Sequence, residues 1–303
     1  MLEIGLYGLG RMGGNMARRL ARGGARVVAC NRSFEVTEQI AAEEANVRPC
    51  RSLEELVAAL APPRIVWLML PAGAPTQAAL DQLGGLLAPG DMVVDGANAY
   101  YKEAQQRAGI LAGQGLAFAD VGVSGGIWGL ANGYCLMAGG DKAAVARIEP
   151  FLKLLAPAPD RGWMHAGPAG AGHFVKMVHN GIEYGMMQAL AEGFALMQGK
   201  TEFDLDLAET AELWRHSSVV RSWLLDLTAD FLKGDQGLGA IEPFVADSGE
   251  GRWTALESIE QGVPPPVMTL ALMSRFDSQG KADFGNKMLA MMRKGFGGHA
   301  VKS

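Results

Sequence analysis

The sequence predicts an α/β fold in which an N-terminal Rossmann-like, doubly wound parallel sheet is followed by an all-α C-terminal domain. Three observations lead to this prediction. A short apolar run, a glycine-rich turn and a helical pattern open the chain, and further apolar runs alternate with helical patterns as far as residue 138. Beyond residue 162 only helical patterns are found. At 303 residues the chain is long enough for two domains that each bury a core.

The opening segment has the order of a dinucleotide-binding βαβ unit. Residues 2–7 form the first expected strand, and Gly8, Gly10 and Gly13 follow it before a helix that runs through Leu20. In such a unit the glycines allow a tight turn, close approach of a pyrophosphate, and packing of helix on strand. The helix N-terminus offers free N–H groups to the phosphates. The residues expected to bind the cofactor here are Gly8, Leu9, Gly10, Arg11, Met12 and Gly13.

The end of the second expected strand, residues 26–30, indicates which nicotinamide cofactor is used. An acidic residue there would bind the adenosine ribose and repel a 2′-phosphate. The chain has Asn31, Arg32 and Ser33 instead, and an arginine can clasp a phosphate or stack on adenine. This pattern favours NADP and leaves NAD possible. The alternative for Arg32 is an ordinary surface arginine.

Hydrophobic patterning predicts the next elements in order. Strands are expected at residues 64–70, 91–95, 117–121 and 134–138. Helical patterns lie between the strands, and one of them begins at a capping box formed by Ser52 and Glu55. Ligands of such sheets bind at the carboxyl ends of the strands. At those ends, Leu70, Pro71 and Asn98 are expected to bind the cofactor, and Ser124, Gly125 and Gly126 lie in a further turn where a ligand is expected.

Residues 157–162 are rich in turn formers and predict a domain boundary. The two expected domains are 1–162, which binds NAD(P), and 163–303, which is all-helical and serves substrate binding and oligomerisation. No strand is expected beyond residue 162. The helical patterns there cover residues 170–198, 203–215, 219–232, 250–260, 265–277 and 283–293.

The first of these helices carries a polar stripe. At about 100° per residue, Lys176, His179, Asn180, Glu183 and Tyr184 share one face. Lys176 and Glu183 are two turns apart, roughly 10 Å along the axis, so one small molecule could meet a base and an acid. The alternative is a solvated polar face. The polar residues lie among apolar neighbours, which favours a catalytic helix.

Composition excludes several classes of function. The net charge of −5 and the pI near 5.6 argue against a nucleic-acid partner. The three scattered cysteines suit reduced thiols in a cytoplasm, and the five histidines lack ligand spacing, so no metal is expected.

The N-terminus leads directly into a strand, which argues against a signal peptide. The longest apolar run, residues 65–70, is too short to span a membrane.

Taken together, the motifs resemble the decarboxylating 6-phosphogluconate dehydrogenases in their shorter form, within the β-hydroxyacid dehydrogenase superfamily. The matching segments are residues 8–15, 95–98, 123–126, 176–184, 214–215, 221–222, 251–254 and 296–299. The most specific is Lys-Met-Val-His-Asn-Gly-Ile-Glu-Tyr at 176–184. The wider superfamily shares the glycine turn, the Ser-Gly-Gly loop, the lysine and the asparagine, but usually not the Glu-Tyr ending.

The resemblance implies oxidative decarboxylation of 6-phosphogluconate to ribulose 5-phosphate, without a metal, in the pentose phosphate pathway or in gluconate utilisation. It implies that Lys176 is the base that accepts the C3 hydroxyl proton and that Glu183 is the acid that protonates C1 of the enediol. The residues that would hold the carboxylate and hydroxyls are Asn98, Ser124, Gly125, Gly126, His179 and Asn180.

The resemblance also implies a phosphate site and a homo-oligomer. Arg275 matches the family's phosphate-binding arginine, and Tyr184 would add a hydroxyl. In the family the C-terminal tail reaches into the neighbouring subunit's site, and Arg293 and His299 occupy the matching positions here. For Arg293 the alternative is a solvated helix end beside Lys294.

Departures from the family pattern leave alternatives open. The second copy of the helical region found in longer members is absent, and their phosphate-binding lysine has no clear counterpart, although Arg252 lies nearby. Many short members have an acid at the position of Asn31 and prefer NAD. The competing functions are a 3-hydroxy acid dehydrogenase of the 3-hydroxyisobutyrate type and a non-catalytic dinucleotide-binding protein.

Overall fold

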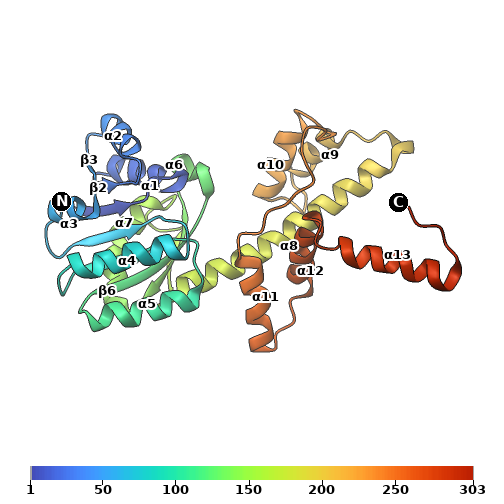
Figure 1. Cartoon of the computed structure of the whole chain (residues 1–303). Helices are drawn as coiled ribbons and strands as arrows, with labels where there is room; N and C mark the ends of the chain where they lie inside the picture. Colours follow the sequence, from blue (N-terminus) through green and yellow to red (C-terminus); the bar gives the residue numbers. More distant parts are fainter. Residues whose placement is uncertain (1, 303) are drawn as a thin grey trace. The chain divides into compact units, whose positions relative to one another are not determined.

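Eight strands form one sheet in the N-terminal part of the chain, in the order β3-β2-β1-β4-β5-β6-β7-β8 (Figure 1). The strands are β1 (Glu3–Tyr7), β2 (Arg26–Cys30), β3 (Val47–Cys50), β4 (Ile65–Leu68), β5 (Met92–Asp95), β6 (Ala117–Ser124), β7 (Cys135–Gly140) and β8 (Trp163–Gly167). The computed structural model describes residues 2–302. The chain divides into two compact units, Met1–Met177 and Val178–Ser303.

Neighbouring strands are parallel except for β6 and β7, which run antiparallel. β1 lies between β2 and β4, where the strand order changes direction. In open α/β sheets, ligands bind outside the carboxyl ends of the strands at such a point. The mostly parallel, doubly wound sheet expected from the sequence is confirmed.

Helices cover both faces of this sheet, and each face has its own apolar core. One core joins Met16 and Leu20 of α1 to Ile148 of α7, whereas the other joins Leu56 of α3 to Leu83 of α4. The helical segments of this unit are α1 (Arg11–Arg22), α2 (Phe34–Glu43), α3 (Leu53–Ala59), α4 (Ala74–Leu86), α5 (Tyr101–Gly113), η1 (Gly126–Trp128), α6 (Gly129–Asn132) and α7 (Lys142–Leu155). Burial of these side chains is the main stabilising term of the unit.

Helices are the only regular secondary structure in the described part of the C-terminal unit. Its elements are the remainder of α8 (Ala171–Gly199), η2 (Thr201–Phe203), α9 (Leu207–Trp214), α10 (Trp223–Leu232), α11 (Glu250–Gln261), α12 (Pro266–Ser278) and α13 (Asp283–Gly297). Phe194 of α8 packs with Leu207 of α9 and Leu225 of α10 in a small apolar core. Asp206 and Ser222 cap the two shorter helices by accepting backbone N–H groups.

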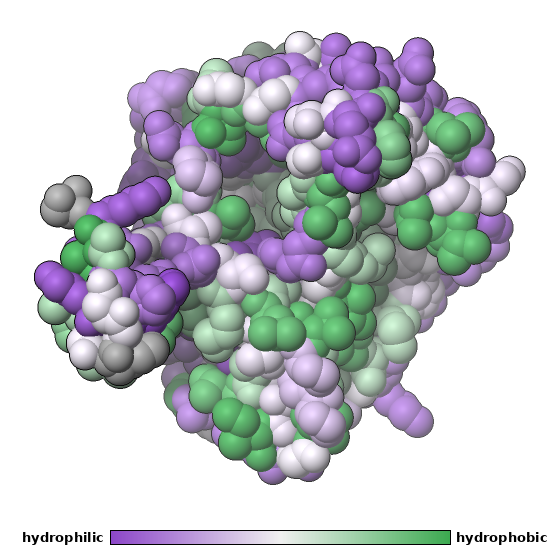
Figure 2. Space-filling view, turned by 90° about the vertical axis from the view of Figure 1, so that its right-hand side faces the viewer, coloured by the Kyte–Doolittle hydropathy of each residue, from purple (hydrophilic) through white to green (hydrophobic). Residues whose placement is uncertain are grey.

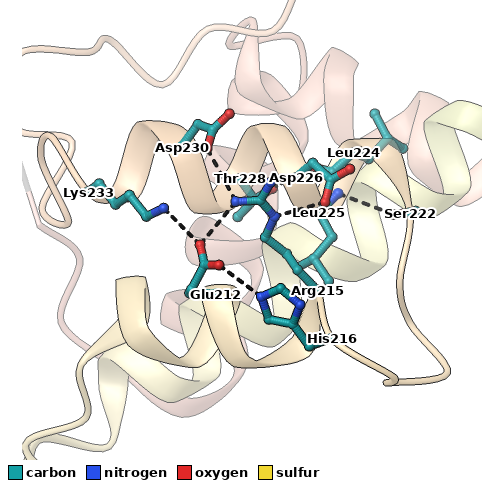
Figure 3. A network of polar contacts seen from close by, with 10 residues as sticks. All are labelled: Glu212, Arg215, His216, Ser222, Leu224, Leu225, Asp226, Thr228, Asp230 and Lys233. Carbon is teal, nitrogen blue, oxygen red and sulfur yellow. Dashed lines mark hydrogen bonds and ion pairs between the residues drawn. The ribbon is translucent and has the colours of Figure 1, made fainter.

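An ion-pair network joins α9 to α10 (Figure 3). The Arg215 guanidinium donates to Asp226 at 2.9 Å and to Glu212 at 3.0 Å, and Lys233 pairs with Glu212 at 2.7 Å. Hydrogen bonds from Lys233, His216 and Arg215 lower the pKa of Glu212 to about 2. The carboxylate therefore stays ionised across the ordinary pH range.

Two strands were not expected from the sequence. β3 has only two buried apolar residues, and β8 has no β-branched residue, so their patterns are weak. Both lie at edges of the sheet, where pairing with one neighbour defines them. The expectation that no strand lies beyond residue 162 is wrong, because β8 begins at Trp163.

Within residues 2–302, no helix combines the length and the apolar character that a membrane span requires.

Candidate active site

The glycine turn after β1 has the close backbone approaches that its sequence predicts. Gly8 has a φ of 98°, and a Cβ added to it would lie 2.4 Å from the carbonyl oxygen of Met69. A Cβ added to Gly13 would lie 2.0 Å from the carbonyl oxygen of Gly8. A Cβ added to Gly10, at the N-terminus of α1, would have no other atom within 4 Å outside Gly10 and its chain neighbours. A phosphate can therefore approach the backbone there.

Asn31 has a role that sequence reasoning missed. Its side-chain oxygen accepts the N–H of Leu9 at 2.9 Å, and its side-chain nitrogen donates to the carbonyl of Ser33 at 3.2 Å. The residue after β2 thus ties the glycine turn to the start of α2. This contact joins segments more than twenty residues apart, so no local pattern in the sequence reveals it.

The cationic groups at this edge of the sheet are exposed. Arg32 forms no ion pair with any described acidic residue. Arg51 follows β3, and the register that pairs Cys30 with Cys50 places it beside the end of β2. Its guanidinium lies 3.8 Å from the ring centroid of Phe34, the first residue of α2. Two arginines, Arg32 and Arg51, therefore lie just beyond the carboxyl ends of the neighbouring strands β2 and β3.

Buried polar residues hold the next two turns at the carboxyl edge. The hydroxyl of Thr76 donates to the carbonyl of Pro71 at 2.8 Å and fixes the turn that also contains Leu70. Asp95 ends β5, accepts the N–H of Ala97 at 3.0 Å, and pairs with the buried Arg107 at 3.0 Å. The turn after β5 is therefore rigid.

Asn98, which follows that turn, is exposed and can reach a ligand. The sequence patterns predicted these turns. They did not predict that Thr76 and Arg107, from the helices that follow the turns, would form hydrogen bonds with them.

The loop after β6 requires glycine. Gly125 has a φ of 126° and Gly126 a φ of 53°, values that residues with a side chain adopt rarely. Ser124, the last residue of β6, is half-buried beside them. The side chain of Asn15 in α1 donates to the carbonyl of Ile127 at 3.1 Å and so joins the loop to the glycine-turn helix.

Lys176 lies on α8 within the N-terminal unit and is only 9% exposed. A Cβ added to Gly122 of β6 would lie 2.4 Å from the Cβ of Lys176, so the helix lies directly against the strand. Burial raises the pKa of the Cys135 thiol, and the charge of Lys176 opposes that rise. Because Cys135 pairs with Ser124 across β6 and β7, the amine lies near the end of β6.

The polar stripe of α8 is buried while an apolar residue of the same helix is exposed. Asn180 and Tyr184 are 8% and 6% exposed, whereas Ile182 is 51% exposed. His179 and Glu183 are half-buried, with Nδ1 of His179 3.8 Å from a carboxylate oxygen of Glu183. A solvated polar face does not explain a helix that buries an amine and an amide and exposes an isoleucine.

The C-terminal unit brings Tyr184 and Arg275 together. The Arg275 guanidinium lies 3.5 Å from the ring centroid of Tyr184 and donates to the carbonyl of Ala246 at 2.7 Å. The Tyr184 hydroxyl lies 3.2 Å from the hydroxyl of Ser248. This cluster can present a hydroxyl and a guanidinium to an anion.

Arg252 is engaged by its own loop. It forms an ion pair with Asp247 and stacks on Phe276, with 4.5 Å from its Cζ to the ring centroid. Burial would raise the pKa of Asp247, but hydrogen bonds from Arg252 and the N–H of Gly249, with the charge of Arg275, lower it overall. The charge of Arg252 is thus already compensated within the unit.

Arg293 and His299 lie on α13 and just beyond it. Both are exposed, as is every side chain of α13 whose burial the structure describes. Arg293 forms no ion pair with an acidic residue among residues 2–302. In the same range, no group of three His, Cys, Asp or Glu side chains could hold a metal ion.

Comparison with known proteins matches both units. Residues 3–164 match the model of the NAD binding domain of 6-phosphogluconate dehydrogenase, and residues 172–296 match the model of the 6-phosphogluconate dehydrogenase C-terminal domain. The chain is 40% identical to the NAD(+)-dependent, decarboxylating 6-phosphogluconate dehydrogenase of Haloferax volcanii, over 99% of this chain and 98% of that protein. It is 38% identical to the decarboxylating enzyme of Synechococcus elongatus, over 93% of this chain and 62% of that protein.

Among solved structures, Plasmodium falciparum 6-phosphogluconate dehydrogenase superposes with a TM-score of 0.84 at 29% identity. The match covers 99% of this chain and 66% of the other. Both the sequence and the fold lead to the same conclusion. The chain belongs to the 6-phosphogluconate dehydrogenase family.

Proposed function

We propose that the chain catalyses oxidative decarboxylation of 6-phosphogluconate to ribulose 5-phosphate and CO2, with reduction of NADP and, less efficiently, of NAD. The observation that carries the proposal is the buried polar stripe of α8, with Lys176 and Asn180 each below 10% exposed. The names of the relatives support the oxidative decarboxylation, since the Haloferax protein is named as an NAD(+)-dependent, decarboxylating 6-phosphogluconate dehydrogenase. The Plasmodium enzyme is described in an apo form, in complex with NADP+ and in complex with 6-phosphogluconate.

In the proposed reaction Lys176 accepts the proton of the C3 hydroxyl while hydride leaves C3. NADP, when bound, accepts that hydride. Desolvation of an amine favours its neutral, proton-accepting form. The resulting β-keto acid loses CO2 because its C3 carbonyl accepts the electron pair, and the protonated lysine donates a hydrogen bond to that oxygen. Glu183 then protonates C1 of the enediol.

Several polar groups are proposed to orient the substrate. Ser124, Gly125, Gly126 and Asn98, from turns after β5 and β6, are proposed to hold the carboxylate and hydroxyls, together with His179 and Asn180. Arg275 and Tyr184 are proposed to bind the phosphate, because a guanidinium and a hydroxyl in contact suit a dianion. A 3-hydroxy acid without a phosphate would have no use for this pair.

The residues around β2 fit NADP. The open backbone at Gly10 suits the pyrophosphate, with Leu9, Arg11 and Met12 in the same turn. Arg32 has no acidic partner among the described residues, and a second guanidinium, Arg51, lies at the adjacent strand end. Both favour a cofactor that carries a 2′-phosphate. We further propose residues 1–162 as the cofactor-binding domain.

Self-association would complete the phosphate site. The apolar side chains of α13 whose burial the structure describes are exposed. On the face that Figure 2 shows, hydrophobic residues in green lie among hydrophilic residues in purple. Helices with an uncovered apolar face commonly pack against another chain. We propose that the tail of a second copy supplies Arg293 and His299. The reduced, unpaired Cys30, Cys50 and Cys135 suit a cytoplasmic location.

The test of the proposed function is a comparison of substrates. Purified protein is incubated with NADP or NAD and either 6-phosphogluconate or 3-hydroxyisobutyrate, and NAD(P)H and CO2 are measured. The expected result is equal release of NADPH and CO2 from 6-phosphogluconate alone. Turnover of 3-hydroxyisobutyrate alone would replace the proposal with the 3-hydroxy acid alternative, and no turnover of either would indicate a non-catalytic protein.

A further inference from the structure

Asp120 is a buried carboxylate that the proposed chemistry does not use. It lies in β6, opposite Asp95 at the end of β5, and is fully buried. One of its oxygens accepts the N–H of Gly170 at 2.6 Å, and the other accepts the N–H of His173 at 2.8 Å. No cationic side chain among residues 2–302 forms an ion pair with it.

These two hydrogen bonds cap α8 from the sheet. The first N–H groups of a helix have no partner inside the helix, and an oxygen acceptor there stabilises the helix start. The cap is usually a neighbouring residue in the chain, but here it comes from a strand fifty residues earlier. Because both carboxylate oxygens are used, the first turn of α8 is held at two points and its rotation about Asp120 is restricted.

Glycines bring the capped helix into direct contact with the sheet. A Cβ added to Gly172 would lie 2.4 Å from the carbonyl oxygen of Met137 and 2.6 Å from that of Asp120. A Cβ added to Gly122 would lie 2.4 Å from the Cβ of Lys176. No side chain separates the helix from the strand at these points. A displacement of the β6 backbone would therefore also displace the helix backbone at Lys176.

The three relevant residues of β6 share one face. Side chains alternate along a strand, so Asp120, Gly122 and Ser124 point to the same side. Asp120 caps α8, Gly122 contacts Lys176, and Ser124 begins the loop proposed to hold the substrate carboxylate. One face of one strand therefore sets the distance between the proposed base and the proposed carboxylate site.

We infer that Asp120 is a positioning residue that holds the Lys176 amine in register with the Ser124 loop. The inference rests on the proposed function. An asparagine at 120 would keep one acceptor but would direct an amide N–H toward a backbone N–H of the α8 start. The helix start would shift, and small displacements of a reacting group lower turnover by up to about 100-fold.

The matched control is Asp91, a second buried carboxylate of the same sheet. It accepts the N–H groups of Arg64 and Ala88, at 2.6 and 3.0 Å, and pairs with the Arg64 side chain. However, Asp91 precedes β5 and so lies at the amino edge of the sheet, away from the candidate site. Asp91→Asn therefore removes a comparable buried carboxylate without touching α8.

The experiment compares wild type, Asp120→Asn and Asp91→Asn in steady-state assays with 6-phosphogluconate and NADP, alongside thermal unfolding. We expect both variants to lose thermal stability. We expect kcat to fall by about 10- to 100-fold in Asp120→Asn only, with the KM for NADP within twofold of wild type. A kcat for Asp120→Asn within twofold of Asp91→Asn would overturn the inference.

A second variant keeps the test decisive if Asp120→Asn does not fold. Gly122→Ala retains the cap but places a methyl group against Lys176, so kcat should fall while NADP binding is retained. In that case wild-type kcat for Gly122→Ala would overturn the inference. Failure of the proposed function itself is distinguishable, because wild type and Asp91→Asn would then also be inactive on 6-phosphogluconate.

Discussion

The guanidinium of Arg275 lies 3.5 Å above the ring of Tyr184, and both residues belong to the C-terminal unit. The hydrogen bond from Arg275 to the carbonyl of Ala246 fixes its position further. A cation stacked on an aromatic face is held with little loss of its remaining donors. The arrangement therefore leaves charged guanidinium N–H donors of Arg275 available to an anion.

Arg275→Lys is expected to raise the KM for 6-phosphogluconate by about 10- to 100-fold, with a smaller effect on kcat. The lysine keeps the charge but loses the fork geometry and the stacking, a loss of about 1.5–3 kcal/mol for charged hydrogen bonds. Tyr184→Phe removes only the hydroxyl and so separates its contribution to phosphate binding from that of the guanidinium. Initial rates over a range of substrate concentration would measure both, and an unchanged KM in Arg275→Lys would contradict the phosphate role.

Arg32→Glu is expected to weaken NADP binding by about 2–3 kcal/mol and to affect NAD much less, because only NADP carries the 2′-phosphate. Arg48→Ala, an exposed arginine of β3, should leave both cofactors unaffected. Calorimetric titration of each cofactor gives the two dissociation constants. Equal weakening of NAD and NADP would remove Arg32 from the phosphate site.

Lys176→Met is expected to lower kcat by about 10²–10⁴-fold, which is the usual contribution of a general base. Cofactor affinity should be retained, because the glycine turn is untouched. Lys142→Met, at the exposed start of α7, serves as the surface control. Single-turnover absorbance at the NADPH band would report hydride transfer directly, and near-normal turnover in Lys176→Met would rule out this base.

Asp247 predicts a pH dependence of stability. Its pKa in the folded chain lies below the ordinary value of 3.8, so the native state binds the proton less readily than the unfolded chain does. Its contribution is present above pH 3.8 and is lost as the pH falls through the lowered pKa. Thermal unfolding of wild type and Asp247→Asn should differ at pH 7 and converge at lower pH. A difference that is constant with pH would indicate that the ion pair with Arg252 is not its source.

Helix α13 predicts an effect on assembly. Phe284, Met288, Met291 and Met292 have helical spacing i, i+4, i+7 and i+8 and are all exposed. Met288→Glu should weaken self-association, whereas Asn286→Glu, on the opposite side of the helix, should not. Sedimentation velocity over a range of concentration would separate the two. Identical assembly of both variants would argue that another surface joins the subunits.

Local patterns in the sequence predicted most of the fold. The spacing of Gly8, Gly10 and Gly13 identified the turn, whereas only one half of the capping box predicted at residues 52–55 forms, with Ser52 accepting the N–H of Glu55. The carboxylate of Glu55, however, accepts the N–H of Arg51 and not that of Ser52. Such patterns depend on residues within one or two turns, which is why the sequence reveals them.

The parts that could not be predicted depend on contacts between distant segments. The cap from Asp120 to Gly170 spans fifty residues, and the hydrogen bond from Leu9 to Asn31 spans twenty-two. The edge strand β8 forms because β7 offers a pairing edge, not because its own residues favour a strand. Residue type alone indicates neither partner.

The side chain of Asn31 has a consequence for redesigning coenzyme preference. Aspartate at this position could still accept the N–H of Leu9, but its second oxygen would face the carbonyl oxygen of Ser33, where the amide now donates. Two acceptors in contact repel, so the segment leading into α2 would have to rearrange. A switch toward NAD by a single acidic substitution should therefore be poorly tolerated, and successful switches should combine it with a change at Ser33 or Phe34.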